Sequence, residues 1–423
     1  MMIRKLIPKG RFSKNVVTLI TGTALAQALP IAITPILTRL YTPEDFGVFA
    51  VFMAVSSILA VLVTGRYELA IIVPQKNEDA INIVALSVAF SFIVSFFIFL
   101  GVLIFGEQVA LALGQEGLEN WLYLVPISTL LMGCFQSLNY WNNRCSNYKR
   151  MAASRVLQST SAGAAQLGGG FSKLSYFGLI GGQVIGQFLS LMFLLKSLIK
   201  NNQADLGKIN KKQIKMVAVR YKNFPQFLIL AHGFNAGSSQ SPALLLTGLF
   251  SAPVAGFYML TQRVLNAPIG LVANAIRDVF RQEASSQYAK GKECRAIYLS
   301  TLKKLALLSF LPFLLLFFVA EHLFAIVFGE EWRVSGEYAA ILAPMFFLRF
   351  ITSPLSSMFM IAEVQKIDLI WQIFLFISVI SSLFFGGYYN SIEVALYSFS
   401  LIYCLMFLIN LYLSYGLACG KYK

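Results

Sequence analysis

The segment LTRLYTPEDFGVF at residues 37–49 aligns without a gap with LTGLFSAPVAGFY at residues 246–258. The offset between the two segments is 209 residues, about half of the 423-residue chain. Four pairs of positions are identical: Leu37 and Leu246, Thr38 and Thr247, Leu40 and Leu249, and Gly47 and Gly256. An offset of this size favours an internal duplication, with chance similarity between two membrane hairpins as the alternative. The sequence therefore predicts two related halves.

Composition indicates that these halves lie in a membrane. The chain is 57% hydrophobic, its mean hydropathy is +0.69 and only 13% of its residues are charged, against roughly 25% in soluble domains. A helix needs about 20 apolar residues to cross the hydrocarbon layer. Such stretches are expected at 16–38, 46–64, 81–105, 121–141, 155–171, 174–199, 226–250, 253–276, 303–328, 337–361, 368–389 and 392–416. The predicted fold class is an all-α polytopic membrane protein with about twelve transmembrane helices.

Twelve spans divide into six for each half. Because six is an even number, both halves enter the membrane from the same side, and the repeats are parallel. We expect an N-terminal lobe at 1–199, a basic cytoplasmic linker at 200–222 and a C-terminal lobe at 223–423, with a central cavity between the lobes. The span at 155–171 is small and polar, so it is either buried against closely approaching neighbours or a re-entrant loop.

Basic residues set the expected orientation. With the N-terminus inside, the segments assigned to the cytoplasm hold 29 Lys and Arg residues and the outer segments hold three. Both termini are therefore expected in the cytoplasm, and the net charge of +15 is interpreted as a topology signal rather than as nucleic-acid binding. The first apolar stretch runs to about Leu37, longer than the roughly 7–15 residues of a signal-peptide core, so it is expected to be retained as a span.

The stretch GFYMLTQRVLNAPIGLVANAIRDVFRQEAS at 256–285 combines an apolar composition with arginines. Its polar positions recur at helical spacing, which predicts that they share one face. These positions are Arg263, Asn266, Gly270, Asn274 and Arg277. An arginine inside the membrane costs about 2.5–3.5 kcal/mol on insertion scales unless it faces protein or water. This face is predicted to look into a cavity; the alternative is that Arg263 snorkels or caps neighbouring carbonyls.

Other expected spans carry polar stripes, any of which could instead be a helix–helix contact. They include Gln27 in the first span, His232 and Asn235 in the seventh and Arg349 in the tenth. None of the 19 carboxylates falls in the central part of an expected span, since Glu321, Glu337, Asp368 and Glu393 lie toward span ends. Arg263 and Arg349 are therefore expected to have no counter-ion there. An unpaired buried charge is unfavourable, and phosphate suits the planar arginine fork. We therefore predict that the ligand supplies the anion.

Sequence patterns of catalysis are missing. The sequence contains no P-loop, GxSxG or HExxH pattern, and its five cysteines lack metal or redox spacing. We expect a protein that is not an enzyme and needs no cofactor or metal, namely a secondary transporter that rocks one lobe against the other. A channel or a structural membrane protein is the alternative, but it leaves the repeat and the polar stripes unexplained.

Four segments carry a family resemblance: RLYTPEDFG (39–47), GRYELAIIVP (65–74), NAPIGLVANAIRDVFRQEAS (266–285) and FGEEWRVSGEYAAILAPMFFLRFITSPLS (328–356). They resemble the recurring segments of Wzx-type polysaccharide-biosynthesis flippases. These belong to the multidrug/oligosaccharidyl-lipid/polysaccharide (MOP) exporter superfamily, together with the multidrug (MATE) exporters and the lipid II flippase. The resemblance covers essentially the whole chain.

The resemblance implies that the chain moves an undecaprenyl-diphosphate-linked oligosaccharide, such as an O-antigen unit, from the cytoplasmic to the periplasmic leaflet of the bacterial inner membrane. A proton or sodium gradient is the implied energy source, with a polysaccharide polymerase and chain-length proteins as further partners. His232, which changes charge near neutral pH, is the candidate for ion coupling, with a packing histidine as the alternative. The candidate substrate-binding residues are Arg263, Arg349, Asn266, Asn274, Gln27, Asn235, Gln262, Arg277 and Arg66.

Three other functions compete with this interpretation. A MATE-type exporter of cationic drugs would be expected to have a membrane-embedded carboxylate, which the central parts of the expected spans lack. A lipid II flippase usually has two extra helices. A scaffold for a glycan-assembly complex would not need the cavity arginines for export.

Overall fold

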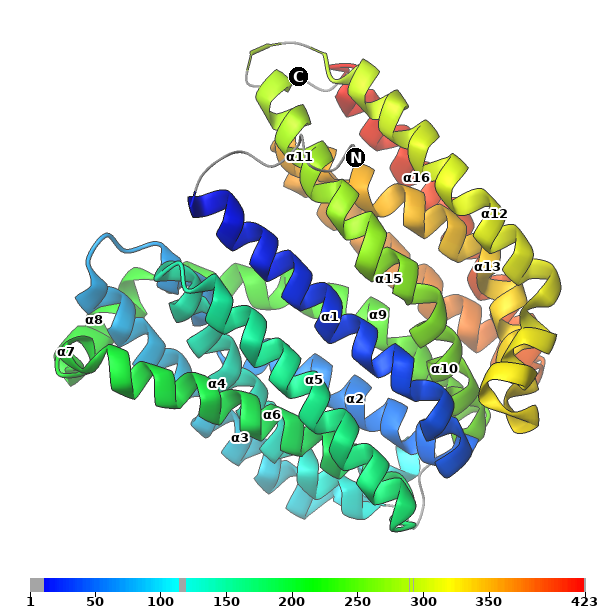
Figure 1. The fold of residues 1–423 in the computed structure, drawn as a ribbon, viewed down its shortest axis with the longest axis horizontal. Coiled ribbons are helices and arrows are strands. Elements are labelled where there is room, and N and C mark those ends of the chain that lie inside the picture. The colour runs from blue at the N-terminus through cyan, green and yellow to red at the C-terminus, as the bar shows by residue number, and fades with distance from the viewer. Residues whose placement is uncertain (1–10, 114–118, 289, 292, 422–423) are drawn as a thin grey trace. The chain divides into compact units, whose positions relative to one another are not determined.

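The computed structural model describes residues 11–113, 119–288, 290–291 and 293–421 (Figure 1). In these residues helices are the only regular secondary structure. The basic residues Arg4, Lys5 and Lys9 and the end of the chain, which carry part of the expected topology, lie outside the described residues.

The helices of the first half follow the expected spans closely. They are α1 (Arg11–Leu40), α2 (Pro43–Val63), α3 (Asn77–Ala112), α4 (Leu124–Arg144), α5 (Tyr148–Phe171) and α6 (Tyr176–Asn201). Shorter elements are η2 (Tyr67–Ile72), η3 (Glu119–Tyr123), α7 (Gln203–Leu206), α8 (Lys211–Arg220) and η4 (Phe224–Leu228).

The second half repeats this pattern with more interruptions. Its helices are α9 (Ile229–Leu249), α10 (Ala252–Pro268), α11 (Asn274–Tyr288), α12 (Arg295–Phe328), α13 (Arg333–Leu355), α14 (Ser357–Ile361), α15 (Gln365–Tyr388) and α16 (Ile392–Ala418), with η5 (Ile269–Ala273) and η6 (Glu330–Trp332) between them.

Nine helical segments within the described residues are long and apolar enough to cross a membrane. Their outer faces are apolar: in α12, Leu307 is 83% exposed and Ile326 is 76% exposed. Such continuous apolar surfaces are typical of contact with lipid. The other three expected spans form α5, α9 and α10, which are more polar, so the count of twelve spans stays a prediction.

The chain forms two compact units. The N-terminal unit contains Met1–Ile33, Phe52–Leu111 and Glu116–Ala236, and the C-terminal unit contains Thr34–Val51, Ala112–Gln115 and Gly237–Lys423. The expected linker at 200–222 thus falls within the N-terminal unit, and the hairpin at 34–51, which joins α1 to α2, falls within the C-terminal unit.

Helix α5 is one uninterrupted helix, so it is not a re-entrant loop. It lies against α6, and small residues allow the close approach that its composition predicts (Figure 1). A Cβ atom on Gly186 would come within 2.7 Å of the Gln158 carbonyl oxygen, and one on Gly182 within 3.0 Å of the Ala162 carbonyl oxygen. Packing of this kind is how polar, glycine-rich helices associate in membranes.

The two repeat segments meet inside the C-terminal unit. A Cβ atom on Gly47 would overlap the carbonyl oxygen of Ala252, and one on Gly256 would overlap the carbonyl oxygen of Pro43. Pro43 and Ala252 are separated by the same offset as Gly47 and Gly256, so the contact is reciprocal. Residue pairs that exchange roles across a contact are what two copies of one segment produce when they cross about a local two-fold axis.

Local chemistry fixes the start of α2 at this crossing. The Asp45 carboxylate accepts hydrogen bonds from the Thr42 backbone N–H at 3.0 Å and the Thr42 hydroxyl at 3.1 Å. The Asp45 backbone N–H donates to the Thr42 hydroxyl oxygen at 3.2 Å. This capping box satisfies groups that a helix start leaves unpaired.

The stretch at 256–285 departs from the regular helix that its spacing predicts. Pro268 cannot donate a backbone hydrogen bond, and directly after it the chain forms the π-helical turn η5. A π-helical turn holds more residues than an α-helical turn, so Asn274 and Arg277 rotate away from the face that Arg263 and Asn266 occupy. The prediction that all five polar positions share one regular helix face is therefore wrong.

We expect alanine at either crossing glycine to destabilise the protein. Overpacking of this kind costs about 1–3 kcal/mol, so Gly47→Ala and Gly256→Ala should each lower the thermal unfolding temperature of the purified protein in detergent. The control is Gly181→Ala, since nothing lies within 4 Å of its added Cβ. That change should be neutral or stabilise the helix by up to about 1 kcal/mol. Equal unfolding temperatures for all three variants would contradict the close crossing.

Candidate substrate-binding site

Arg263 lies on α10 in the C-terminal unit, beside the 34–51 hairpin. Its Nη1 atom donates a hydrogen bond to the Thr34 hydroxyl oxygen at 3.2 Å, and its guanidinium carbon lies 5.9 Å from the centroid of the Phe46 ring. A hydroxyl and an aromatic face orient a guanidinium without neutralising it. Among the described residues, no carboxylate forms an ion pair with Arg263.

A chain of amides runs along α10 next to this arginine. Asn266 donates from Nδ2 to the Gln262 backbone carbonyl at 2.8 Å and to its side-chain oxygen at 2.7 Å. Gln262 in turn donates from Nε2 to the Tyr258 hydroxyl. Tyr258 packs edge-on against Phe399 of α16, with ring centroids 6.2 Å apart. These contacts hold three polar side chains in fixed orientations beside one cation.

Trp332 was not among the residues singled out from sequence, although it lies in the quoted segment 328–356. It is buried, and its indole Nε1 donates to the Thr38 carbonyl oxygen at 2.9 Å. Its ring packs edge-on against Phe46 and Phe257, at centroid distances of 4.8 and 5.9 Å. Trp332 thus holds the end of α1 and the start of α2 against α10.

The remaining C-terminal candidates do not share this setting. Arg349 on α13 is half-buried, with its guanidinium carbon 5.6 Å from the Phe346 ring centroid. Asn274 donates to the Gly270 carbonyl oxygen at 3.1 Å within its own helix. Arg277 is half-buried on α11, beyond the π-helical turn. No carboxylate in the described part of the chain pairs with Arg349 or Arg277.

Four candidates belong to the N-terminal unit. Gln27 on α1 and Asn235 on α9 are exposed, and His232 is half-buried. Arg66 forms an ion pair with Glu68, with Nη1 3.2 Å from Oε1. This pairing makes Arg66 a weaker candidate for an anion site than Arg263.

The burial of Glu68 was not foreseen from sequence. It lies in η2, between the expected spans, but its side chain is 0% exposed. One of its oxygens, Oε2, and the Arg66 Nε atom have no hydrogen-bond partner. The Arg66–Glu68 pair and His232 are close enough for their charges to interact. No periodic pattern in the sequence distinguishes a carboxylate that folds back into the protein from one that remains in solvent.

Another arginine contacts α1, and it was not among the candidates selected from sequence. Arg155 of α5 donates from Nη1 to the Thr23 hydroxyl oxygen at 2.7 Å. One turn further along, the Ser159 hydroxyl donates to the Ala26 carbonyl oxygen at 2.6 Å. Polar residues of α1 therefore contact other segments within each unit. Thr23 contacts α5 in the N-terminal unit, and Thr34 and Thr38 contact Arg263 and Trp332 in the C-terminal unit.

These contacts suit the binding of a polar anion. Arg263 supplies a permanent positive charge and several N–H donors, and Gln262 and Asn266 supply amide groups of the kind that pair with hydroxyls. Residues that could hold a catalytic metal are missing, since no group of three or more His, Cys, Asp or Glu side chains gathers within the described residues.

Comparisons with known proteins agree with the fold. The family model described as a polysaccharide biosynthesis protein matches residues 36–337. The succinoglycan biosynthesis transport protein ExoT of Rhizobium meliloti (strain 1021) is 24% identical over 329 residues, which are 76% of this chain and 63% of that protein. The chain thus spans less than two thirds of the length of this relative.

Two solved structures share the architecture. One is the inward-facing conformation of a multidrug resistance MATE family transporter of the MOP superfamily, with a TM-score of 0.67 and 14% identity over 94% of this chain and 93% of that chain. The other is the lipid II flippase MurJ in an inward closed conformation, with a TM-score of 0.67 and 13% identity over 95% of this chain and 86% of that chain. These likenesses confirm the all-α polytopic membrane fold.

We expect Trp332→Phe to destabilise the protein more than a matched change elsewhere. The variant keeps an aromatic ring but removes the hydrogen bond to Thr38, a loss of about 1 kcal/mol beyond that of ring volume. The control is Trp121→Phe, because Trp121 is equally buried and its Nε1 has no hydrogen-bond partner. Thermal unfolding in detergent measures both. A larger loss for Trp121→Phe would contradict the role given to the Trp332 hydrogen bond.

Proposed function

The chain belongs to the family described as polysaccharide biosynthesis protein, and we propose that it flips an undecaprenyl-diphosphate-linked oligosaccharide across the bacterial inner membrane. In this proposal the two lobes alternate access, the termini are cytoplasmic, and the glycan moves toward the periplasmic leaflet. The protein is then a transporter rather than an enzyme. An ion gradient drives it, and a polymerase and chain-length proteins act on the delivered glycan.

The observation that carries the proposal is the setting of Arg263. Its partners are the neutral Thr34 hydroxyl and the Phe46 ring, and the described residues offer it no carboxylate. A diphosphate would bring the missing negative charge and could accept paired hydrogen bonds from the guanidinium fork. Gln262 and Asn266 lie beside it, where amides could bind sugar hydroxyls. In this proposal Arg349, Asn274, Arg277, Gln27 and Asn235 contribute further contacts.

An exporter of cationic drugs is less well supported by the same geometry. Such an exporter needs a carboxylate that is free to bind a cation or a proton. Glu68 is the buried carboxylate of the N-terminal unit that comes closest to this requirement, but Arg66 already neutralises it. Arg263, whose charge no described carboxylate neutralises, would repel a cationic substrate.

Substitutions at Arg263 should separate the contribution of its positive charge to export from that of its planar hydrogen-bonding fork. Arg263→Ala should lower glycan export per molecule of membrane-inserted protein by at least about tenfold, because it removes both the charge and the hydrogen bonds. Arg263→Lys keeps the charge but loses the planar fork, so it should leave partial activity. Arg263→Glu should be inactive, since it places a like charge against the phosphates.

The measurement is export of the lipid-linked glycan in a deletion strain, divided by the amount of each variant in the membrane. Arg295→Ala is the control, because Arg295 is exposed at the start of α12. It should export as much as the wild type. Equal export per molecule for Arg263→Ala and the wild type would remove Arg263 from the site. If export instead falls only as far as protein abundance falls, the arginine is structural.

We also propose that His232 takes part in proton coupling. An imidazole changes charge near neutral pH, and His232 lies within electrostatic reach of Arg66 and Glu68. His232→Gln should flatten the dependence of export on pH between about pH 5 and 8. Asn235→Ala, on the same helix, should leave that dependence unchanged. A His232→Gln variant with the pH profile of the wild type would show that this histidine only packs.

A further inference from the structure

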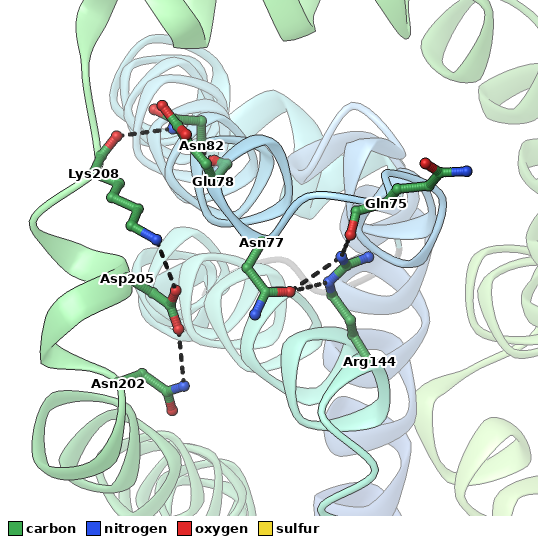
Figure 2. Close-up of polar contacts among 8 residues, drawn as sticks. All are labelled: Gln75, Asn77, Glu78, Asn82, Arg144, Asn202, Asp205 and Lys208. Carbon is green, nitrogen blue, oxygen red and sulfur yellow. Dashed lines mark hydrogen bonds and ion pairs between the residues drawn. The ribbon is translucent and has the colours of Figure 1, made fainter.

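Helix α8, in the segment expected as a linker, is fixed to the N-terminal unit by hydrogen bonds. Asn82, in the first part of α3, donates from Nδ2 to the Lys208 carbonyl oxygen at 3.1 Å (Figure 2). It also accepts from the Asn210 backbone N–H at 3.0 Å. The Asn210 side chain then caps α8 by accepting from the Lys212 backbone N–H at 3.0 Å. The start of α8 is therefore held at the end of a membrane span.

Asp79 and Tyr67 hold the rest of the helix. Asp79 accepts a hydrogen bond from Gln213 Nε2 at 2.6 Å and lies 3.9 Å from Arg220 Nη1. The Tyr67 hydroxyl donates to the Ala218 carbonyl oxygen at 3.1 Å. These contacts span the length of α8, so it is docked along its side rather than by one end.

The segments around α8 are also held by hydrogen bonds and an ion pair. Lys208 Nζ lies 3.9 Å from Asp205 Oδ1, and Asn202 donates to the same carboxylate at 3.3 Å (Figure 2). Arg144, at the end of α4, donates to the carbonyl oxygens of Pro74 at 2.6 Å and Gln75 at 3.1 Å, in the loop that leads into α3. The start of α3, the ends of α4 and α6 and helix α8 thus form one layer, at one end of these helices.

The two faces of α8 differ in character. The buried face centres on Val217, which is 0% exposed. The exposed face consists of Lys211, Lys212, Lys215, Met216, Val219 and Arg220. Its two apolar members stand among the four basic ones: Met216 is 47% exposed and Val219 is 62% exposed. Within the described residues, Lys211, Lys212 and Lys215 form no ion pair.

We propose that the exposed face of α8 is a docking surface for the anionic phospholipid headgroups of the leaflet on its side of the membrane. Three features of the structure support this occupant. The face has a charge opposite to that of the headgroups, it lies at the level where the spans end, and its apolar side chains can enter the boundary between headgroups and acyl chains.

Docking would have a consequence for the whole N-terminal unit. Because Asn82 and Asp79 join α8 to the first turns of α3, attraction of α8 to the lipid surface also fixes the depth of α3. The inference does not depend on the transported substrate, since the ligand is the bulk lipid rather than the cargo.

The test uses the full-length protein in lipid nanodiscs, with Met216→Cys as the single labelled position in a cysteine-free background. An environment-sensitive fluorophore at this position reports contact with the lipid surface. In nanodiscs with about one quarter phosphatidylglycerol, its emission should shift to the blue, and headgroup-labelled nitroxide lipids should quench it. In pure phosphatidylcholine both effects should be weaker, and about 0.5 M salt should reduce them in the anionic discs.

The decisive variant is Lys211→Gln, Lys212→Gln and Lys215→Gln together, which should reduce the effect of phosphatidylglycerol by about threefold or more. The control removes the same amount of charge from three exposed positions in α12, with Arg295→Gln, Lys303→Gln and Lys304→Gln. This variant should retain the full effect of phosphatidylglycerol. Should the triple variant fail to fold, the salt dependence of the otherwise unaltered labelled protein still decides the matter.

Three outcomes would overturn the proposal. Identical emission in anionic and neutral nanodiscs would show that the face does not meet the lipid. An equal loss in the control variant would show that only net charge matters. If soluble inorganic phosphate added to neutral nanodiscs reproduced the blue shift, the face would be a site for free anions rather than for a lipid surface.

Discussion

The close crossing of α2 and α10 at Gly47 and Gly256 is the constraint on which the candidate site depends. Each glycine accepts a backbone carbonyl of the other helix at a distance that a Cβ atom would forbid. The crossing brings the outer hairpin of the first half onto the second half. Thr34 and Phe46 thereby come beside Arg263, and Thr38 comes within hydrogen-bond distance of Trp332.

The arginine that results is held by neutral groups, and this distinguishes it from the arginines that pair with carboxylates. Arg66 is neutralised by Glu68, and Arg333 by Glu330 and Glu321, whose carboxylates raise the pKa of Arg333 through hydrogen bonds. Arg263 has hydrogen bonding and ring contact but no opposite charge. An unneutralised charge in a medium of low dielectric constant attracts anions strongly, because the protein offers no competing partner.

Much of the fold could be predicted from sequence, because apolar length and basic asymmetry are strong signals in membrane proteins. The expected spans reappear as helices, and the aligned glycines reappear as a reciprocal contact. The π-helical turn after Pro268 could not be predicted, since a proline within a helix can lead to a kink, a break or a bulge depending on its neighbours. The positions of Asn274 and Arg277 changed for this reason. Burial of Glu68 and the hydrogen bond of Trp332 depend on contacts between distant segments, which periodicity does not encode.

The two aligned halves differ at the positions that carry the residues around Arg263. At the repeat offset, Arg263 corresponds to Ala54 and Asn266 to Ser57 in α2, and Ala54 is fully buried among apolar residues. The crossing glycines are kept in both copies, whereas the charged and amide residues are found only in the second. The two segments therefore share the glycines that let the helices pack closely, but they differ in their charged and amide residues. An arginine at position 54 would have to be desolvated where Ala54 is now fully buried, and this is unfavourable without a counter-ion.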